Sequence, residues 1–178
     1  MSALVLYDDA TARQFEPFSL TRPTSELRAG TTIIRRRWED ALGLRASGFV
    51  AGEHLADFEE LDAPPVARGE IAAGTVIAQA RFAPALAAAP ADAGVWTSAG
   101  RVAAVKLDAA IPATTLRGGG ATLESLAPQG ADSREIEGWW IDEVWDLIRH
   151  LHPMITADVE RMDGCGHAAP LAAKTTIS

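Results

Sequence analysis

The sequence has little cysteine and no long apolar run, and both absences exclude classes of protein. Cys165 is the single cysteine among 178 residues, so no disulfide can form within the chain, which is typical of a reducing compartment. No run of about 18 apolar residues could span a bilayer. The apolar start, Met1 to Tyr7, reaches Asp8 and Asp9 too early for the core of a signal peptide. We therefore expect a cytoplasmic protein with no membrane partner.

Lysine is also scarce, because arginine supplies fourteen of the sixteen basic residues. The net charge of −8 is uneven: residues 1–50 hold seven arginines against six acids, and the rest holds nine bases against eighteen acids. Such an acidic chain would repel a nucleic-acid backbone, so we expect no nucleic-acid partner. A small phosphate ligand needs only a local group of donors, and guanidinium groups match phosphate oxygens in pairs. The N-terminal region is therefore where we expect an anionic ligand.

The order of the predicted elements indicates an α/β fold. A buried strand over Ala3–Tyr7 precedes a long loop, Asp8 to Gly30, and then a helix that Thr31 or Thr32 caps and Gly43 ends. The later predicted elements are strands over Ser47–Ala51 and Thr75–Ala80, a short acidic helix over Leu55–Leu61, and a hairpin of Val95–Ser98 with Val102–Leu107. This alternation favours a mostly parallel sheet flanked by helices, with a small β-hairpin insertion. In such sheets ligands bind at the carboxyl ends of strands, which is where the loop after Tyr7 begins.

The segment Ile141–Met162 carries the strongest helical pattern in the chain. Its apolar residues recur at helical spacing, which predicts a helix that packs on the core and buries Trp145 there. Pro153 should break or kink this helix near His152. The following residues, 163–178, are small and polar and are predicted to form a linker.

Two stretches of the chain resemble a known family. The first contains Asp8-Asp9, Arg13, Thr21-Arg-Pro23, Glu26-Leu-Arg-Ala-Gly30 and Trp38-Glu39, and the second contains Val144-Trp-Asp-Leu-Ile148, Ile155 and Asp158. They are similar to the N-terminal domain of a bacterial family related to bifunctional UDP-N-acetylglucosamine pyrophosphorylase and glucosamine-1-phosphate acetyltransferase. The resemblance spans most of the chain and is densest in residues 3–39 and 141–160. It implies a Rossmann-like nucleotidyltransferase-type domain over residues 1–162, with 163–178 leading to a β-helix of hexapeptide repeats that this chain lacks.

The resemblance also implies a chemistry. A sugar-1-phosphate such as N-acetylglucosamine-1-phosphate would attack the α-phosphorus of a nucleoside triphosphate such as UTP, and pyrophosphate would leave. Such reactions depend on positioning and charge stabilisation. Asp8 and Asp9 would hold Mg²⁺, and Arg13 and Arg22 would act in catalysis; these four, with Glu26 and Arg28, would bind the nucleotide and the sugar phosphate. A homo-oligomer would form through the C-terminal domain that the chain lacks.

Several of these residues allow a second interpretation. Ordinary sugar nucleotidyltransferases carry a glycine-rich first loop, whereas here Asp8 and Asp9 would repel a triphosphate unless Mg²⁺ bridges them. The pair is equally consistent with aspartates that cap a turn. Glu26 and Arg28 could simply pair with each other. These features favour an alternative: a degenerate, catalytically weak domain that binds a sugar nucleotide or acts as a scaffold for an adjoining hexapeptide-repeat acyltransferase. A stand-alone interaction module is the third hypothesis.

Other conspicuous residues stay outside the predicted site. The run Arg35–Arg37 is predicted to be a helix face, and Gly118–Gly120 a flexible loop that lacks the lysine or hydroxyl residue of a P-loop. Trp139 or Trp140 could stack on a base or sugar, although a place at an interface is the simpler interpretation.

Overall fold

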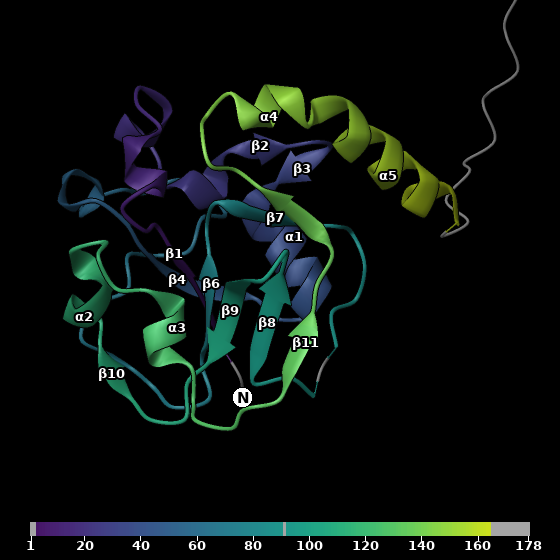
Figure 1. Cartoon of the computed structure of the whole chain (residues 1–178). Helices are drawn as coiled ribbons and strands as arrows, with labels where there is room; N and C mark the ends of the chain where they lie inside the picture. The colour runs from purple at the N-terminus through teal and green to yellow at the C-terminus, as the bar shows by residue number, and fades with distance from the viewer. Residues whose placement is uncertain (1–2, 91, 165–178) are drawn as a thin grey trace, which may run out of the picture.

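A central sheet organises the chain in the computed structural model, which describes residues 3–90 and 92–164 (Figure 1). Within these residues six strands lie in the order β11-β8-β9-β6-β1-β4. The strands are β1 (Leu4–Tyr7), β4 (Ala46–Val50), β6 (Val76–Gln79), β8 (Val95–Ser98), β9 (Arg101–Lys106) and β11 (Ser133–Glu135). Strand β1 pairs in parallel with β4 and β6, and β11 with β8, whereas β9 is antiparallel to β6 and β8. The predicted α/β class with a mostly parallel sheet is confirmed, and the predicted hairpin, β8–β9, is part of the sheet itself.

Both faces of the sheet are covered. Leu4 and Leu6 of β1 face a core that includes helix α1 (Ile34–Leu42). Val5 and Tyr7 face a second core that helices α2 (Thr114–Arg117) and α3 (Leu123–Leu126) complete. Because a central parallel strand is buried on both sides, its sequence is a continuous apolar run.

Helix α1 begins two residues later than the sequence predicts. Thr32 and Ile33 form strand β3 (Thr32–Ile33), which pairs with β2 (Arg28–Ala29) and so delays the helix to Ile34. Its predicted end is correct: Gly43 takes a φ of +63°, a left-handed conformation that a side chain would strain, and its N–H bonds to the Glu39 carbonyl.

The C-terminal helical segment is two helices, α4 (Asp146–Arg149) and α5 (Leu151–Gly164). The break at His150 lies three residues before Pro153. The ring of a proline clashes with the carbonyl four residues before it, so a regular helix does not continue through Pro153. The predicted orientation is wrong, because Trp145 is 59% exposed and the apolar residues Ile148, Leu151, Ile155, Val159 and Met162 are also exposed. Met154 and Asp158 face the domain instead, so α5 packs on the domain through these residues and not through the predicted apolar stripe.

The connections contain short elements that position the loops. These are η1 (Ala12–Gln14), η2 (Phe18–Leu20), η3 (Thr24–Glu26), η4 (Glu53–Leu55), β5 (Glu70–Ile71), β7 (Phe82–Pro84), β10 (Ile111–Pro112) and β12 (Gly138–Trp140). The predicted helix over Leu55–Leu61 is wrong, since only the 3-10 turn η4 forms there. Strand β12 pairs with β7 and brings its tryptophans beside the sheet.

In the part of the chain that the structure describes, no helix is both long and apolar enough to cross a membrane. The predicted linker lies outside the described residues, apart from 163 and 164, which belong to α5.

Candidate functional site

A cavity of about 220 Å³ lies at the carboxyl ends of β1 and β6. The chain leaves β1 towards β4 on one side and later returns to β6 on the other, so the strand order reverses between β1 and β6. Open α/β sheets bind ligands at such a reversal. The cavity is lined by Asp9, Ala10, Thr11, Gln79, Arg81, Arg101, Val102, Gly119, Gly120, Ala121, Thr122, Glu124 and Trp140.

Arg81, which follows β6, connects two carboxylates of the site. Its Nε donates to both oxygens of Asp9, at 3.0 and 2.8 Å, and its Nη1 donates to Asp142 Oδ1. Asp9 Oδ1 also accepts the Ala12 N–H at 2.9 Å. Asp9 is therefore both the cap of the first loop and the carboxylate that orients Arg81.

Arg101, at the start of β9, meets the same carboxylate. Its Nη1 and Nη2 each donate to one oxygen of Asp142, both at 3.0 Å. Hydrogen bonding to Arg101 holds the pKa of Asp142 below its usual value, so this carboxylate is ionised at neutral pH.

Trp140 of β12 supports both arginines. The guanidinium carbon of Arg101 lies 3.8 Å from the centre of the Trp140 ring, and that of Arg81 lies 5.1 Å from it. The Trp140 indole N–H donates to the Ser98 carbonyl at 3.0 Å, which fixes the ring. The two guanidinium groups are thus held against one aromatic platform at the edge of the cavity.

Asp8 lies away from this cavity although it precedes Asp9. Its side chain is buried, and Oδ2 accepts the Thr24 N–H at 3.1 Å. Oδ1 has no hydrogen-bond partner among the residues that the structure describes. Burial raises the pKa of Asp8 to about 7. Asp8 therefore anchors the loop that carries Thr24.

Arg13 docks the glycine loop rather than facing the cavity. Its guanidinium donates to the carbonyls of Asp8, Arg117 and Leu116, at 3.0, 2.7 and 3.4 Å. A Cβ at Gly119 would lie 2.8 Å from Arg13 Nε, and the φ of Gly119 is +74°, so the loop can approach only as glycine. The Gly119 carbonyl also accepts the Ala10 N–H at 2.9 Å. The segment Gly118–Gly120, predicted as a flexible loop, is bonded to the first loop, and its residues Gly119 and Gly120 line one wall of the cavity.

The other predicted site residues line a second hollow of about 370 Å³, which includes Arg22, Glu26 and Arg28. Arg22 reaches Glu60 at 3.7 Å, and Arg28 donates to the Thr31 carbonyl. Glu26 is buried and bonds to Arg35 rather than to Arg28, at 2.6 and 3.1 Å. Of the six predicted residues, Asp9 alone lines the cavity at the strand ends.

The prediction that Arg35–Arg37 forms a helix face is wrong for two of its members. Arg35 and Arg37 are buried, and only Arg36 is partly exposed. Arg37 bonds to Asp158 of α5 and to the carbonyls of Ala29 and Pro84, so it joins three segments of the chain. These two arginines stabilise the fold.

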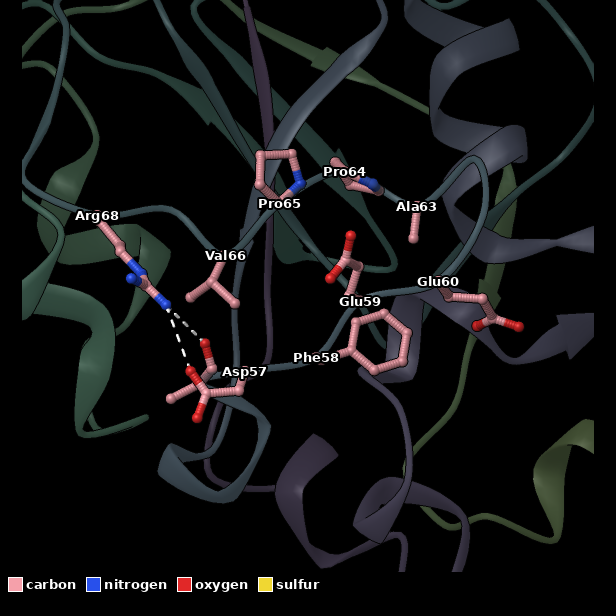
Figure 2. A pocket seen from close by; sticks show the side chains of 10 residues that line it. Asp57, Phe58, Glu59, Glu60, Ala63, Pro64, Pro65, Val66 and Arg68 are labelled. Carbon is pink, nitrogen blue, oxygen red and sulfur yellow. Dashed lines mark hydrogen bonds and ion pairs between the residues drawn. The ribbon is translucent and has the colours of Figure 1, made fainter.

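A broader hollow of about 620 Å³ lies over residues 56–68 (Figure 2). Most of its lining residues are apolar, and its charged members are three carboxylates, Asp57, Glu59 and Glu60, and one cation, Arg68. Arg68 is already engaged by the Ala56 carbonyl at 2.9 Å and by Asp57 at 3.7 Å. This hollow does not suit an anionic ligand.

The predicted magnesium site can be tested against these contacts. Within residues 3–90 and 92–164, no group of three or more His, Cys, Asp or Glu side chains could hold a metal ion. Mg²⁺ that arrives with a nucleotide commonly needs only one or two protein carboxylates. Asp8 does not fit, because it is buried and its pKa of about 7 leaves much of it protonated at neutral pH. Asp9 and Glu124 are the carboxylates that line the cavity, and of these Asp9 follows β1 and pairs with Arg81.

Sequence reasoning did not find Arg81, Arg101 or Asp142. Arg81 stands directly after a predicted strand, so the strand-end rule could have found it. Nothing in the sequence joins Arg101 to Asp142, which are 41 residues apart. The sequence suggests Trp139 or Trp140 as a residue that could stack on a base or sugar, and in the structure Trp140 lies against these two arginines.

Comparison with known proteins gives one finding. A family model described as "Sugar nucleotidyl transferase" matches residues 4–165. No curated protein and no solved structure matches the chain.

Proposed function

This chain belongs to the sugar nucleotidyl transferase family, and we propose that it transfers a nucleotidyl group from a nucleoside triphosphate to a sugar-1-phosphate in the cavity between β1 and β6. The observation that carries this proposal is the pair Arg81 and Arg101, held against Trp140 at a strand-order reversal. Two guanidinium groups on one platform match the oxygens of adjacent phosphates.

The proposed reaction needs charge stabilisation and no covalent nucleophile. An oxygen of the sugar phosphate forms a bond to the α-phosphorus, and the bond from that phosphorus to the bridging oxygen of the β-phosphate breaks. Negative charge develops on the departing pyrophosphate, where Arg81 and Arg101 would neutralise it. Gly119 and Gly120 allow a phosphate to approach the backbone closely. In this proposal they take the part of the glycine-rich first loop that the sequence lacks.

Mg²⁺ is part of the same proposal. Asp9, which follows β1 and lines the cavity, would hold it together with the phosphate groups, and it would supply further neutralisation of their charge. Arg13 and Arg22 have different roles here from those first predicted: Arg13 maintains the wall of the cavity, and Arg22 lies over the second hollow.

For the substrates we propose UTP and N-acetylglucosamine-1-phosphate, on the basis of the resemblance to the pyrophosphorylase family. The cavity of about 220 Å³ is smaller than the roughly 300–1,000 Å³ of a complete ligand pocket. It would hold the phosphates, with the base and sugar extending past its mouth.

A pyrophosphate-release assay tests the proposal directly. Four nucleoside triphosphates would be combined with a set of sugar-1-phosphates, with and without Mg²⁺. We expect the highest kcat/KM for UTP with N-acetylglucosamine-1-phosphate and a loss on the order of 10²-fold or more in Arg101→Ala. Arg134→Ala is the matched control, because Arg134 is an exposed arginine that pairs with one aspartate, Asp92, outside the cavity. No release with any substrate pair would contradict the proposal.

A second candidate function is sugar-nucleotide binding without turnover. It is favoured by one observation: Arg81 and Arg101 are already paired with Asp9 and Asp142. Nucleotide binding measured by calorimetry in a protein that releases no pyrophosphate would support this function over catalysis.

A further inference from the structure

We propose that Asp142 is an internal stand-in for a substrate phosphate: its carboxylate occupies the anion position on Arg81 and Arg101, and an incoming phosphate takes that position over. The inference rests on the proposed function in that the displacing group is taken to be a phosphate of the substrates.

The contacts of Asp142 are those of a bound oxyanion. Both oxygens accept from the two terminal nitrogens of Arg101 at 3.0 Å, a parallel two-bond arrangement. Oδ1 also accepts from Arg81, so one carboxylate bridges two guanidinium groups. A phosphate presents pairs of oxygens to the same fork, and it carries more negative charge than a carboxylate.

Asp142 also covers the arginines from the solvent side. Its side chain is 55% exposed, against 36% for Arg101 and 10% for Arg81. Because Asp142 is the most exposed member of this group, a ligand can reach the ion pair from the solvent without entering the core.

The arginines keep their places when Asp142 leaves. Arg81 retains both Nε contacts to Asp9, and both guanidinium groups retain the Trp140 ring. Removal of the Asp142 charge makes the net charge at the two arginines more positive by one unit, while Asp9 and Glu124 remain as the carboxylates that line the cavity. The site then attracts an anion at groups that are already positioned.

The segment that carries Asp142 does not need to unfold for this exchange. The backbone N–H groups of Asp142 and Glu143 both donate to Asp146 Oδ2 at 2.9 Å. Asp146 is itself held by Arg149 at 2.8 Å. A rotation of the Asp142 side chain alone is therefore enough to free the arginines.

The experiment measures binding of inorganic pyrophosphate to the full chain by calorimetry, in EDTA so that no metal contributes. Asp142→Asn keeps the size of the side chain but removes its charge, and it should tighten binding about tenfold, the effect of relieving a charge-assisted contact. Asp92→Asn is the matched control, because Asp92 is an exposed aspartate on one arginine, Arg134, and its removal changes the net charge equally. It should change affinity less than about twofold, as screened surface charges do. Arg101→Ala in the Asp142→Asn background should abolish the gain.

Each outcome bears on the inference separately from the transferase activity. An unchanged or weaker affinity in Asp142→Asn overturns it, as does the absence of pyrophosphate binding in both proteins. Thermal melting of each variant identifies a loss of fold, and Asp142→Ser then repeats the test with a smaller side chain. Tighter pyrophosphate binding in a protein that releases none from any substrate pair supports the inference while the proposed transferase function fails.

Discussion

Arg37 on α1 and Arg101 at the start of β9 lie in different surroundings. Arg37 is fully buried, and its guanidinium donates to the carbonyls of Ala29 and Pro84, at 2.7 and 3.0 Å, and to Asp158. Arg101 is partly exposed and, among the residues that the structure describes, pairs only with Asp142, which is more exposed than Arg101 is. A buried guanidinium must have its donors satisfied within the protein, whereas an exposed one can exchange its partner for a ligand. Arginine content alone therefore does not locate a binding site; the surroundings of each arginine do.

The largest expected effect is on the buried side of this comparison. Arg37→Met leaves Asp158 as a buried charge without its cation, and we expect the free energy of unfolding to fall by about 3–5 kcal/mol. Urea denaturation measures this loss. Arg36→Ala, on the same helix but partly exposed, should cost at most about 1 kcal/mol. Adding Asp158→Leu to Arg37→Met should restore part of the stability, and equal losses at Arg36 and Arg37 would break the comparison.

Asp8 and Asp9 differ in the same way as the two arginines, because Asp8 is buried and Asp9 pairs with Arg81 at the cavity. The pKa of Asp8 is about 7 in the folded protein, against 3.8 ordinarily, because burial disfavours the charged form. The folded state therefore binds this proton more tightly than the unfolded state does. The resulting stabilisation is fully present below about pH 4 and is lost as the pH rises through 7.

Asp8→Asn should remove this pH dependence. We expect the variant to be more stable than the wild type at pH 8, by on the order of 2 kcal/mol, and similar to it at pH 4. Thermal melting from pH 4 to pH 8 provides the measurement. Asp9→Asn is the comparison, because Asp9 is paired with Arg81 at the cavity. If the stability of the wild type instead rises between pH 5 and 7 while that of Asp8→Asn stays constant, the pKa of Asp8 is not raised by folding.

For Arg101, the partly exposed arginine of the comparison, we expect a substitution to weaken ligand binding and to leave stability unchanged. Arg101→Ala should weaken nucleotide binding by about 1.5–3 kcal/mol, the range for a hydrogen bond to a charged group. Titration calorimetry gives the affinity, and thermal melting should show a nearly unchanged Tm. Arg22→Ala tests the second hollow in the same assay. A larger loss at Arg22 than at Arg101 would move the phosphate site there.

The smallest expected effect concerns the wall that Arg13 maintains. Gly119→Ala places a Cβ against Arg13 at a φ of +74°, and we expect a loss of stability of about 1 kcal/mol or more together with weaker nucleotide binding. Gly118→Ala is the control, since nothing lies within 4 Å of a Cβ there and its φ is −73°. Equal behaviour of the two variants would mean that the contact with Arg13 does not shape the cavity.

Much of the fold could be predicted because it depends on local patterns. The uninterrupted apolar run of β1, the glycine that ends α1 at Gly43, and the β8–β9 hairpin are each specified by a few neighbouring residues. The rule that ligands lie at strand ends also found Asp9, because that rule needs only the end of one strand. A helix at 141–162 was predicted from its spacing as well.

The tertiary structure alone decided which side of that helix is covered and which arginines meet at the cavity. Helical spacing defines an apolar stripe but not its partner, and here Asp158 attaches α5 to Arg37, 121 residues away, while Trp145 faces solvent. Likewise Glu26 pairs with Arg35 instead of Arg28, and Arg81, Arg101 and Asp142 come from three separate segments. Ion pairs form between side chains that the sheet order brings together, so they depend on topology. By itself the sequence determined the elements and the abundance of arginine; the packing of those elements determined which arginines stabilise the fold and which are available to a phosphate.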